Sequence, residues 1–159
     1  MSGLSERAGG LVESWPPGGL VVGLLPDPSD PPWAGRAALA LARAAADRRK
    51  PALILDLAPK DTDLASRFDA ADQTGFAELV AGEVRLWEIV HRHAGGEAFY
   101  VPCGLRTPGA ELARSPACRT LADRVRDAGR ILLVPLDRRG AGEAASAGWV
   151  DGFVRIGDR

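Results

Sequence analysis

The sequence predicts an α/β fold, a three-layer sandwich in which helices flank a mostly parallel sheet of about five strands. Short, continuously apolar runs such as residues 20–25 (LVVGLL) have the length of buried strands. They alternate with longer segments rich in helix-forming residues, such as 36–50 (RAALALARAAADRRK). Strands that are apolar throughout, without alternation, indicate a parallel sheet covered by helices on both faces.

The predicted elements follow one another in a β-α-β pattern. Residues 20–25, 36–50 and 52–57 form a first unit of about thirty residues, the usual size of such a unit. The later runs predict helices at 74–83 and 85–93, a strand at 98–103, a helix over 110–128 interrupted at Pro116, and strands at 130–136 and 152–157.

One domain is expected. A chain of 159 residues is long enough to bury one core and too short for two comfortable ones. Residues 1–19 are rich in glycine, serine and proline, which predicts a flexible N-terminal segment ahead of a domain at 20–159.

Composition narrows the classes of partner. The formal net charge is −1 and acids and bases are interspersed, so no basic stripe points to nucleic acid. No apolar stretch approaches the roughly 18 residues of a membrane span, which predicts no direct membrane insertion and a cytoplasmic location. Two cysteines, Cys103 and Cys118, and two histidines, His91 and His93, have no metal-site spacing, so no metal is expected.

Two longer strings carry a family resemblance. Residues 74–92 (TGFAELVAGEVRLWEIVHR) resemble a G-L-x-x-x-L-x-G-x-x-x-L-x-x-x-I segment, and residues 101–127 (VPCGLRTPGAELARSPACRTLADRVRD) resemble a strand followed by A-G-x-x-P-P-N-P-x-E-L-L-x-S and a helix. Both segments are typical of the cytoplasmic kinase domain of bacterial tyrosine kinases of capsule and exopolysaccharide export, and more widely of MinD/ParA-class P-loop ATPases. The resemblance covers about residues 20–157.

The resemblance implies a nucleotide site that has lost most of its side chains. The family's G-K-[ST] falls on Gly35-Arg36-Ala37, a degenerate Walker A motif, and its D-x-D keeps only Asp56. The acid that should end the third motif falls on Val134. Gly35, Arg36 and Asp56 are therefore vestigial nucleotide-binding candidates, with no catalytic residue, no metal ligand set and no cofactor expected.

The loop ahead of Gly35 argues in the same direction. A phosphate loop binds through successive backbone N–H groups at a helix N-terminus. Here four prolines, which have no N–H, replace potential donors, and two carboxylates add negative charge. These residues are Pro26, Pro28, Pro31, Pro32, Asp27 and Asp30. Each candidate also has an ordinary structural interpretation: Asp56 could cap the following loop, and Arg36 could be a first-turn helix residue.

The predicted function is that of an inactive P-loop ATPase or tyrosine-kinase-like protein, a pseudoenzyme that acts as an interaction or regulatory scaffold in a machine such as one for polysaccharide export. The family's E-x-x-R-x-x-R motif and tyrosine-rich tail are absent, Tyr100 being the only tyrosine. Further sheet follows the last strand in relatives, so an exposed sheet edge, and with it a protein partner or self-association, is expected here.

Two alternatives stay open. One is a nucleotide-responsive switch that binds ATP or ADP weakly through Gly35 and Arg36, without hydrolysis. The other is a RecA-like interaction domain, because residues 15–25 (WPPGGLVVGLL) have the glycine-rich approach of a RecA-type first strand.

Overall fold

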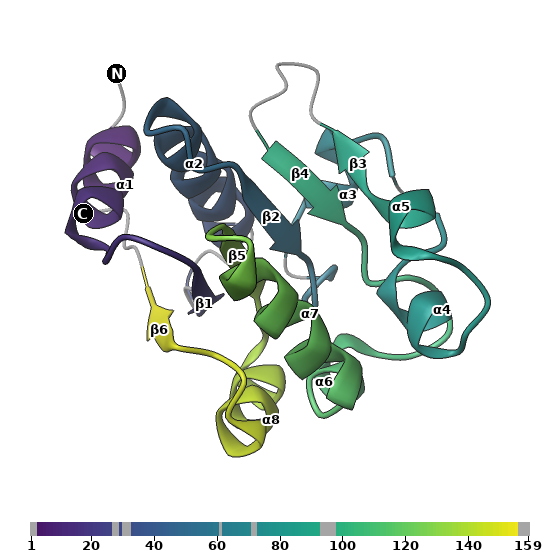
Figure 1. Cartoon of the computed structure of the whole chain (residues 1–159). Coiled ribbons are helices and arrows are strands. Elements are labelled where there is room, and N and C mark those ends of the chain that lie inside the picture. The colour runs from purple at the N-terminus through teal and green to yellow at the C-terminus, as the bar shows by residue number, and fades with distance from the viewer. Residues whose placement is uncertain are drawn as a thin grey trace.

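A computed structural model of the chain describes residues 3–26, 29, 33–60, 62–70, 73–92 and 98–155. Its elements alternate along the chain as the sequence predicts (Figure 1). The helices are α1 (Gly3–Ser14), α2 (Trp33–Asp47), α3 (Leu64–Arg67), α4 (Phe76–Val80), α5 (Leu86–Ile89), α6 (Gly109–Leu112), α7 (Pro116–Asp127) and α8 (Arg138–Ala147). The strands are β1 (Leu20–Leu24), β2 (Ala52–Leu55), β3 (His91–Arg92), β4 (Ala98–Val101), β5 (Ile131–Pro135) and β6 (Gly152–Val154).

The strands form one sheet in the order β3-β4-β2-β5-β1-β6. All neighbouring pairs are parallel except β3 with β4, where His91 faces Tyr100 and Arg92 faces Phe99. The predicted three-layer sandwich with a mostly parallel sheet is therefore confirmed, with β3 as an additional antiparallel strand at one edge.

Two apolar clusters fill the space between the three layers. Successive residues of a strand point to opposite faces, so Val22 and Ile54 pack on one side of the sheet and Val21 and Leu55 on the other. The first cluster lies beneath α1, α2 and α3, and the second beneath α4, α5, α6, α7 and α8. The two clusters thus hold helices against both faces of the sheet.

The N-terminal segment differs from the sequence-based expectation. Residues 3–14 of the predicted flexible lead-in form α1, which lies beside α2 (Figure 1) and buries Leu4, Ala8 and Val12 in the first cluster. The spacing of these three residues at every fourth position gives α1 one apolar stripe, and burial of that stripe outweighs the cost of the glycines within the helix. The helix ends at Ser14, ahead of Pro16 and Pro17.

A second correction concerns residues 85–93, which were predicted as one helix. The helix α5 ends at Ile89, Val90 is extended, and His91–Arg92 pair with β4. Tertiary strand pairing therefore overrides a local helix pattern that buries only Ile89. The interruption predicted at Pro116 is confirmed, because α6 ends at Leu112 and Pro116 begins α7.

Among the described helices, none combines the length and the apolar character that crossing a membrane requires.

Candidate functional site

The position of a phosphate loop lies between the end of β1 and the start of α2. Most of the proline-rich loop, residues 27–28 and 30–32, falls outside the described residues, so the prediction for its backbone donors stays a prediction. The helix α2 itself is described, and with it the surroundings of its first turn. Gly35 is buried, and Arg36 beside it is half-buried.

The chain itself packs against this first turn. A Cβ placed on Gly35 would lie 3.2 Å from the Cβ of Thr62 and 3.2 Å from Oδ1 of Asp63. The backbone of α2 can therefore approach the segment between β2 and α3 closely because residue 35 has no side chain. A side chain at residue 35 would crowd Thr62 and Asp63, so the packing gives glycine a structural reason at this position.

Asp63 brings a negative charge to the same place. Its Oδ2 pairs with Nε of Arg67 at 3.0 Å, while its Oδ1 is buried and, among the described residues, accepts no hydrogen bond. Helix N-termini stabilise nearby anions. A carboxylate of the chain thus lies near the first turn of α2, where the resemblance would place a phosphate.

Asp56 is the second predicted residue, and it is completely buried at the carboxyl end of β2. Its Oδ1 accepts a hydrogen bond from the backbone N–H of Ala58 at 3.1 Å. Its Oδ2 accepts hydrogen bonds from Oγ1 of Thr62 and from the hydroxyl of Tyr100, each at 2.8 Å. Both carboxylate oxygens are therefore engaged within the chain.

Tyr100 fixes this arrangement from β4. Its ring is fully buried and stacks on Phe68 with the centroids 4.7 Å apart and the planes 17° from parallel. Burial, and then the charge and hydrogen bond of Asp56, raise the pKa of Tyr100 well above its usual range. The phenol therefore stays protonated and remains a hydrogen-bond donor to Asp56.

Thr62 joins the two predicted positions. It contacts the backbone of α2 at Gly35 and hydrogen-bonds Asp56. The structure thus brings Gly35 and Asp56 into one neighbourhood, as the resemblance implies, but the segment beginning at Thr62 lies between them. A magnesium ion needs carboxylate and hydroxyl oxygens with free lone pairs facing a phosphate. Here those oxygens are already hydrogen-bonded to the chain.

The other motif positions are buried in the core. Ala37 and Ala58 are each 4% exposed and Val134 is fully buried inside β5. The acid nearest the end of β5 is Asp137, which sequence reasoning missed. Its Oδ1 accepts a hydrogen bond from the N–H of Gly140 at 2.5 Å and so caps the N-terminus of α8.

A cleft of about 500 Å³, a size that suits a small ligand, opens at the carboxyl ends of β2, β4 and β5. Open parallel sheets bind their ligands at this end. The walls are the loops 57–60 and 103–110, with Asp137 and Arg139 beside them. Gly35, Arg36 and Asp56 do not line it, so the predicted residues and the largest cleft at this end are separate.

A buried carboxylate that sequence reasoning did not single out holds one wall of this cleft. Glu78 of α4 is 5% exposed, and its carboxylate accepts hydrogen bonds from the backbone N–H groups of Gly75 at 2.7 Å, Leu105 at 3.2 Å and Arg106 at 3.0 Å. Burial by itself would raise the pKa of Glu78, but these backbone donors outweigh burial and lower it below 4.5. These hydrogen bonds therefore connect α4, within residues 74–92, to the loop after β4, within residues 101–127.

Two glycines permit the close approach of these strings. A Cβ on Gly75 would lie 2.2 Å from the carbonyl oxygen of Pro102, and a Cβ on Gly104 would lie 2.2 Å from Oε1 of Glu78. Gly104 also has a φ of 93°, in the region that favours glycine. Glycine at these positions, three residues before Glu78 and one before Leu105, is the signal that could have found this network.

The cleft offers no activated nucleophile. Cys103 lines it, but burial, followed by the charges of Asp56, Glu78 and Asp137, raises the pKa of its thiol to about 12. The thiol is therefore protonated at neutral pH and unreactive. Among the residues that the structure describes, no group of three or more histidines, cysteines or acids could hold a metal ion.

Comparison with known proteins finds similarity in structure and none in sequence. No protein-family model matches the sequence, and no curated protein matches it. Solved structures do match: the kinase domain of the Escherichia coli tyrosine kinase ETK superposes with a TM-score of 0.72 over 86% of this chain at 16% identity. The chimerical protein CapA2B2 gives a TM-score of 0.72 over 94% of this chain at 15% identity, and the BceF tyrosine kinase domain gives 0.63 over 98% at 16% identity.

The chain has the fold of bacterial tyrosine kinase domains. The resemblance drawn from residues 74–92 and 101–127 is thus confirmed at the level of the fold. The chain spans 55% of the ETK structure, 66% of the CapA2B2 structure and 74% of the BceF structure.

Proposed function

We propose that this tyrosine-kinase-like protein is catalytically inactive and acts as an interaction or regulatory scaffold. The burial of Asp56 is the observation that supports the proposal most directly. Among the described residues, it is the one acid left from the family's nucleotide motifs, and Tyr100, Thr62 and Ala58 already donate hydrogen bonds to its two oxygens. Metal-assisted phosphoryl transfer needs such a carboxylate to be available to the ion.

The remaining positions support the same conclusion. Arg36 stands where the family has a lysine, and a guanidinium is a planar fork rather than a compact ammonium. Ala37 has no hydroxyl for a metal, and Val134 no carboxylate. The exposed apolar side chains Trp87, 73% exposed, and Leu105, 68% exposed, give the molecule contact groups of the kind that protein interfaces use.

The resemblance suggests a setting at the cytoplasmic side of a membrane-associated machine, with polysaccharide export as the first process to examine. A protein partner or a second copy of the chain completes the proposal. Neighbouring genes and co-purifying proteins would test this setting.

Two assays test the inactive state. The purified chain is incubated with ATP and Mg²⁺, and both phosphate release and phosphate incorporation into Tyr100 or any other residue are followed. We expect neither to exceed the level of a heat-denatured sample. Turnover that the Asp56→Asn variant abolishes would contradict the proposal.

The second candidate function is a switch that responds to a nucleotide or another anion without hydrolysing it. The cleft at the carboxyl ends favours it, because the side chains of Lys60 and Arg139 line the cleft and form no ion pair with any described residue. A ligand at one hundred times its Kd adds about 2.7 kcal/mol of stability. At about 2–4 °C per kcal/mol for a domain of this size, the Tm would rise by several degrees.

Thermal unfolding with millimolar ATP, ADP, GTP or GDP therefore separates the two candidates. An unchanged Tm supports the scaffold. A rise that a Lys60→Ala/Arg139→Ala double variant removes supports the switch through the cleft, and a rise that Arg36→Ala removes supports it through the loop ahead of α2.

A further inference from the structure

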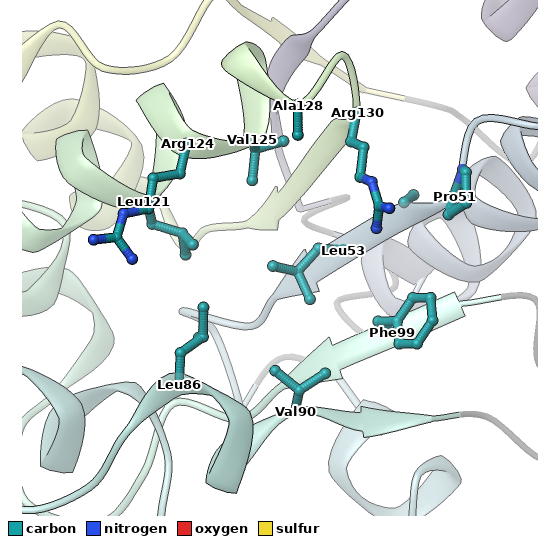
Figure 2. Close-up of a pocket in the computed structure, with 11 residues that line it drawn as sticks. Pro51, Leu53, Leu86, Val90, Phe99, Leu121, Arg124, Val125, Ala128 and Arg130 are labelled. Carbon is teal, nitrogen blue, oxygen red and sulfur yellow. The ribbon is translucent and has the colours of Figure 1, made fainter.

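A groove at the amino-terminal end of the sheet is lined almost entirely by apolar side chains. It lies between α5 and α7 over the strands β2 and β4, and Figure 2 shows Leu53 between Leu86 and Val90 on one side and Val125 on the other. Its volume is about 370 Å³. The ring of Phe99 forms part of the floor beside Val90.

The groove continues along the helices. A second hollow of about 400 Å³ shares Leu86, Leu121 and Arg124 with the first and extends toward Phe76 and Leu79 of α4. The two hollows together form one apolar channel between α4–α5 and α7, which we call the α5–α7 groove. No described residue covers it.

The charged groups of the α5–α7 groove all have one sign. Arg124 and Arg130 line the first hollow and Arg85 and Arg124 line the second, and neither lining contains an acid. In Figure 2 the guanidinium groups of Arg124 and Arg130 lie toward opposite ends of the groove. None of these three arginines forms an ion pair or a side-chain hydrogen bond with a described residue. An occupant with carboxylates at its margins would supply the missing charge partners.

The sheet restricts the backbone conformation of that occupant. β2 is paired on both sides, with β4 and with β5, and β4 is paired with β2 and with β3. The strands under the groove therefore have no free edge to which an extended peptide could add. A peptide buried there must satisfy its own backbone N–H and C=O groups, and a helix does so.

We propose that the α5–α7 groove binds an amphipathic helix of a partner protein, with an apolar stripe that packs on Leu53, Leu86 and Leu121 and with Asp or Glu beside the stripe that pairs with Arg85, Arg124 and Arg130. This inference rests on the proposed scaffold function and names its contact surface and the class of its partner. Trp87 is the exposed neighbour of Leu86 on α5, and it extends the apolar surface offered to the partner helix.

A displayed library of helical peptides tests the proposal without knowledge of the natural partner. The peptides are about sixteen residues long, or about 24 Å of helix, and are randomised at apolar and charged positions. They are selected on the full chain. We expect the enriched sequences to share apolar residues at i, i+3, i+4 and i+7 and an excess of Asp and Glu beside them.

Charge reversal then locates the binding site. The affinity of a selected peptide, measured by fluorescence anisotropy, should fall by about tenfold or more for the Arg124→Glu/Arg130→Glu variant and should also fall with added salt. The matched control is Arg138→Glu, an exposed arginine at the start of α8, which should change the affinity by less than about twofold. A peptide with Lys in place of its acids should bind the double variant better than the unchanged chain.

Several results would overturn the proposal: no enrichment over the starting library, enrichment without an excess of acids, or affinities that the double variant leaves unchanged. A dimer that forms at high concentration and that the double variant prevents would show that a second copy of the chain occupies the groove. That result would overturn the proposal as well. Because no nucleotide enters these measurements, peptide binding can hold while the turnover assay refutes inactivity, and the two failures remain distinguishable.

Discussion

The buried carboxylates at the carboxyl end of the sheet and the arginines of the α5–α7 groove differ in whether they have partners within the chain. At the carboxyl end, the buried carboxylates of Asp56 and Glu78 accept hydrogen bonds from within the chain. In contrast, the arginines of the α5–α7 groove lie beside an uncovered apolar surface and have no ion-pair partner among the described residues. The buried carboxylates are thus satisfied within the chain, whereas the arginines of the groove are not paired with any described residue.

This difference separates charged groups that stabilise the fold from charged groups that are available for an external contact. A buried carboxylate is costly unless it is hydrogen-bonded, and its partners then hold neighbouring elements together. Asp56 joins β2, β4 and the segment before α3, and Glu78 joins α4 to the loop after β4. We interpret both as stabilising elements, and the following predictions test that interpretation.

The largest effect is expected at the closest backbone approach of the carboxyl end. A Cβ on Gly109 would lie 1.9 Å from the carbonyl oxygen of Leu57, so Gly109→Ala must displace α6 from the end of β2. We expect a loss of about 3 kcal/mol or more in the free energy of unfolding, measured by urea denaturation. Gly10→Ala is the control: Gly10 is exposed within α1 with nothing near its Cβ position, and alanine there should add about 0.5–1 kcal/mol. If Gly109→Ala left the free energy of unfolding unchanged, α6 would not be packed closely against the end of β2.

The next effect concerns Asp56. Its replacement by alanine leaves the buried hydroxyl of Tyr100 and the N–H of Ala58 without their acceptor, which we expect to cost about 3 kcal/mol. Tyr100→Phe removes one donor and should cost about 1.5 kcal/mol, and the two changes together should cost less than their sum. Asp47→Ala, an exposed acid at the end of α2, should leave stability unchanged within about 0.5 kcal/mol. An Asp56→Ala variant as stable as this control would mean that the carboxylate is retained for another purpose.

Glu78 should make stability depend on acid. Its folded-state pKa is lowered below the ordinary 4.5, so its contribution is fully present above pH 4.5 and is lost as the pH falls through the lower folded value. Glu78→Gln places an amide N–H₂ toward backbone donors and should cost about 2 kcal/mol near pH 7. Urea unfolding at a series of pH values should show the gap between variant and unchanged chain closing below pH 4.5. A gap independent of pH would contradict the assigned role of the charge.

The smallest effect on stability is expected in the α5–α7 groove. Arg124→Glu and Trp87→Ala alter side chains that form no hydrogen bond or ion pair with a described residue, so each should change the free energy of unfolding by no more than about 0.5 kcal/mol. Losses above about 2 kcal/mol would instead make these groups part of the folded core. The contrast between the buried carboxylates and the groove arginines would then disappear.

The sequence predicted most of the sheet because buried parallel strands read as uninterrupted apolar runs. β1, β2, β4, β5 and β6 all lie within the predicted strand segments. β3 could not be predicted in the same way, because two residues, His91 and Arg92, become a strand only through pairing with β4. The helix α8 was also missed, although Asp137 before it and Gly148 after it are cap residues that local chemistry could have identified.

The sequence predicted which residues belong to the candidate site but not how they contact one another. Gly35 and Asp56 followed from the motif resemblance, but nothing in those motifs indicates that Thr62 contacts both. The partnership of Asp56 with Tyr100 joins residues 44 positions apart and depends on β2 and β4 being neighbours. Such long-range contacts require the folded topology.

One measurement tests the central claim most directly: a ¹H–¹⁵N correlation spectrum of the labelled chain titrated with millimolar ATP and Mg²⁺. If the chain itself occupies the nucleotide position, the amide signals of Gly35, Ala58 and Thr62 should stay where they are at every concentration. Saturable shifts of these three signals that require Mg²⁺ and vanish in the Asp56→Asn variant would show that the site still binds nucleotide and would contradict the account.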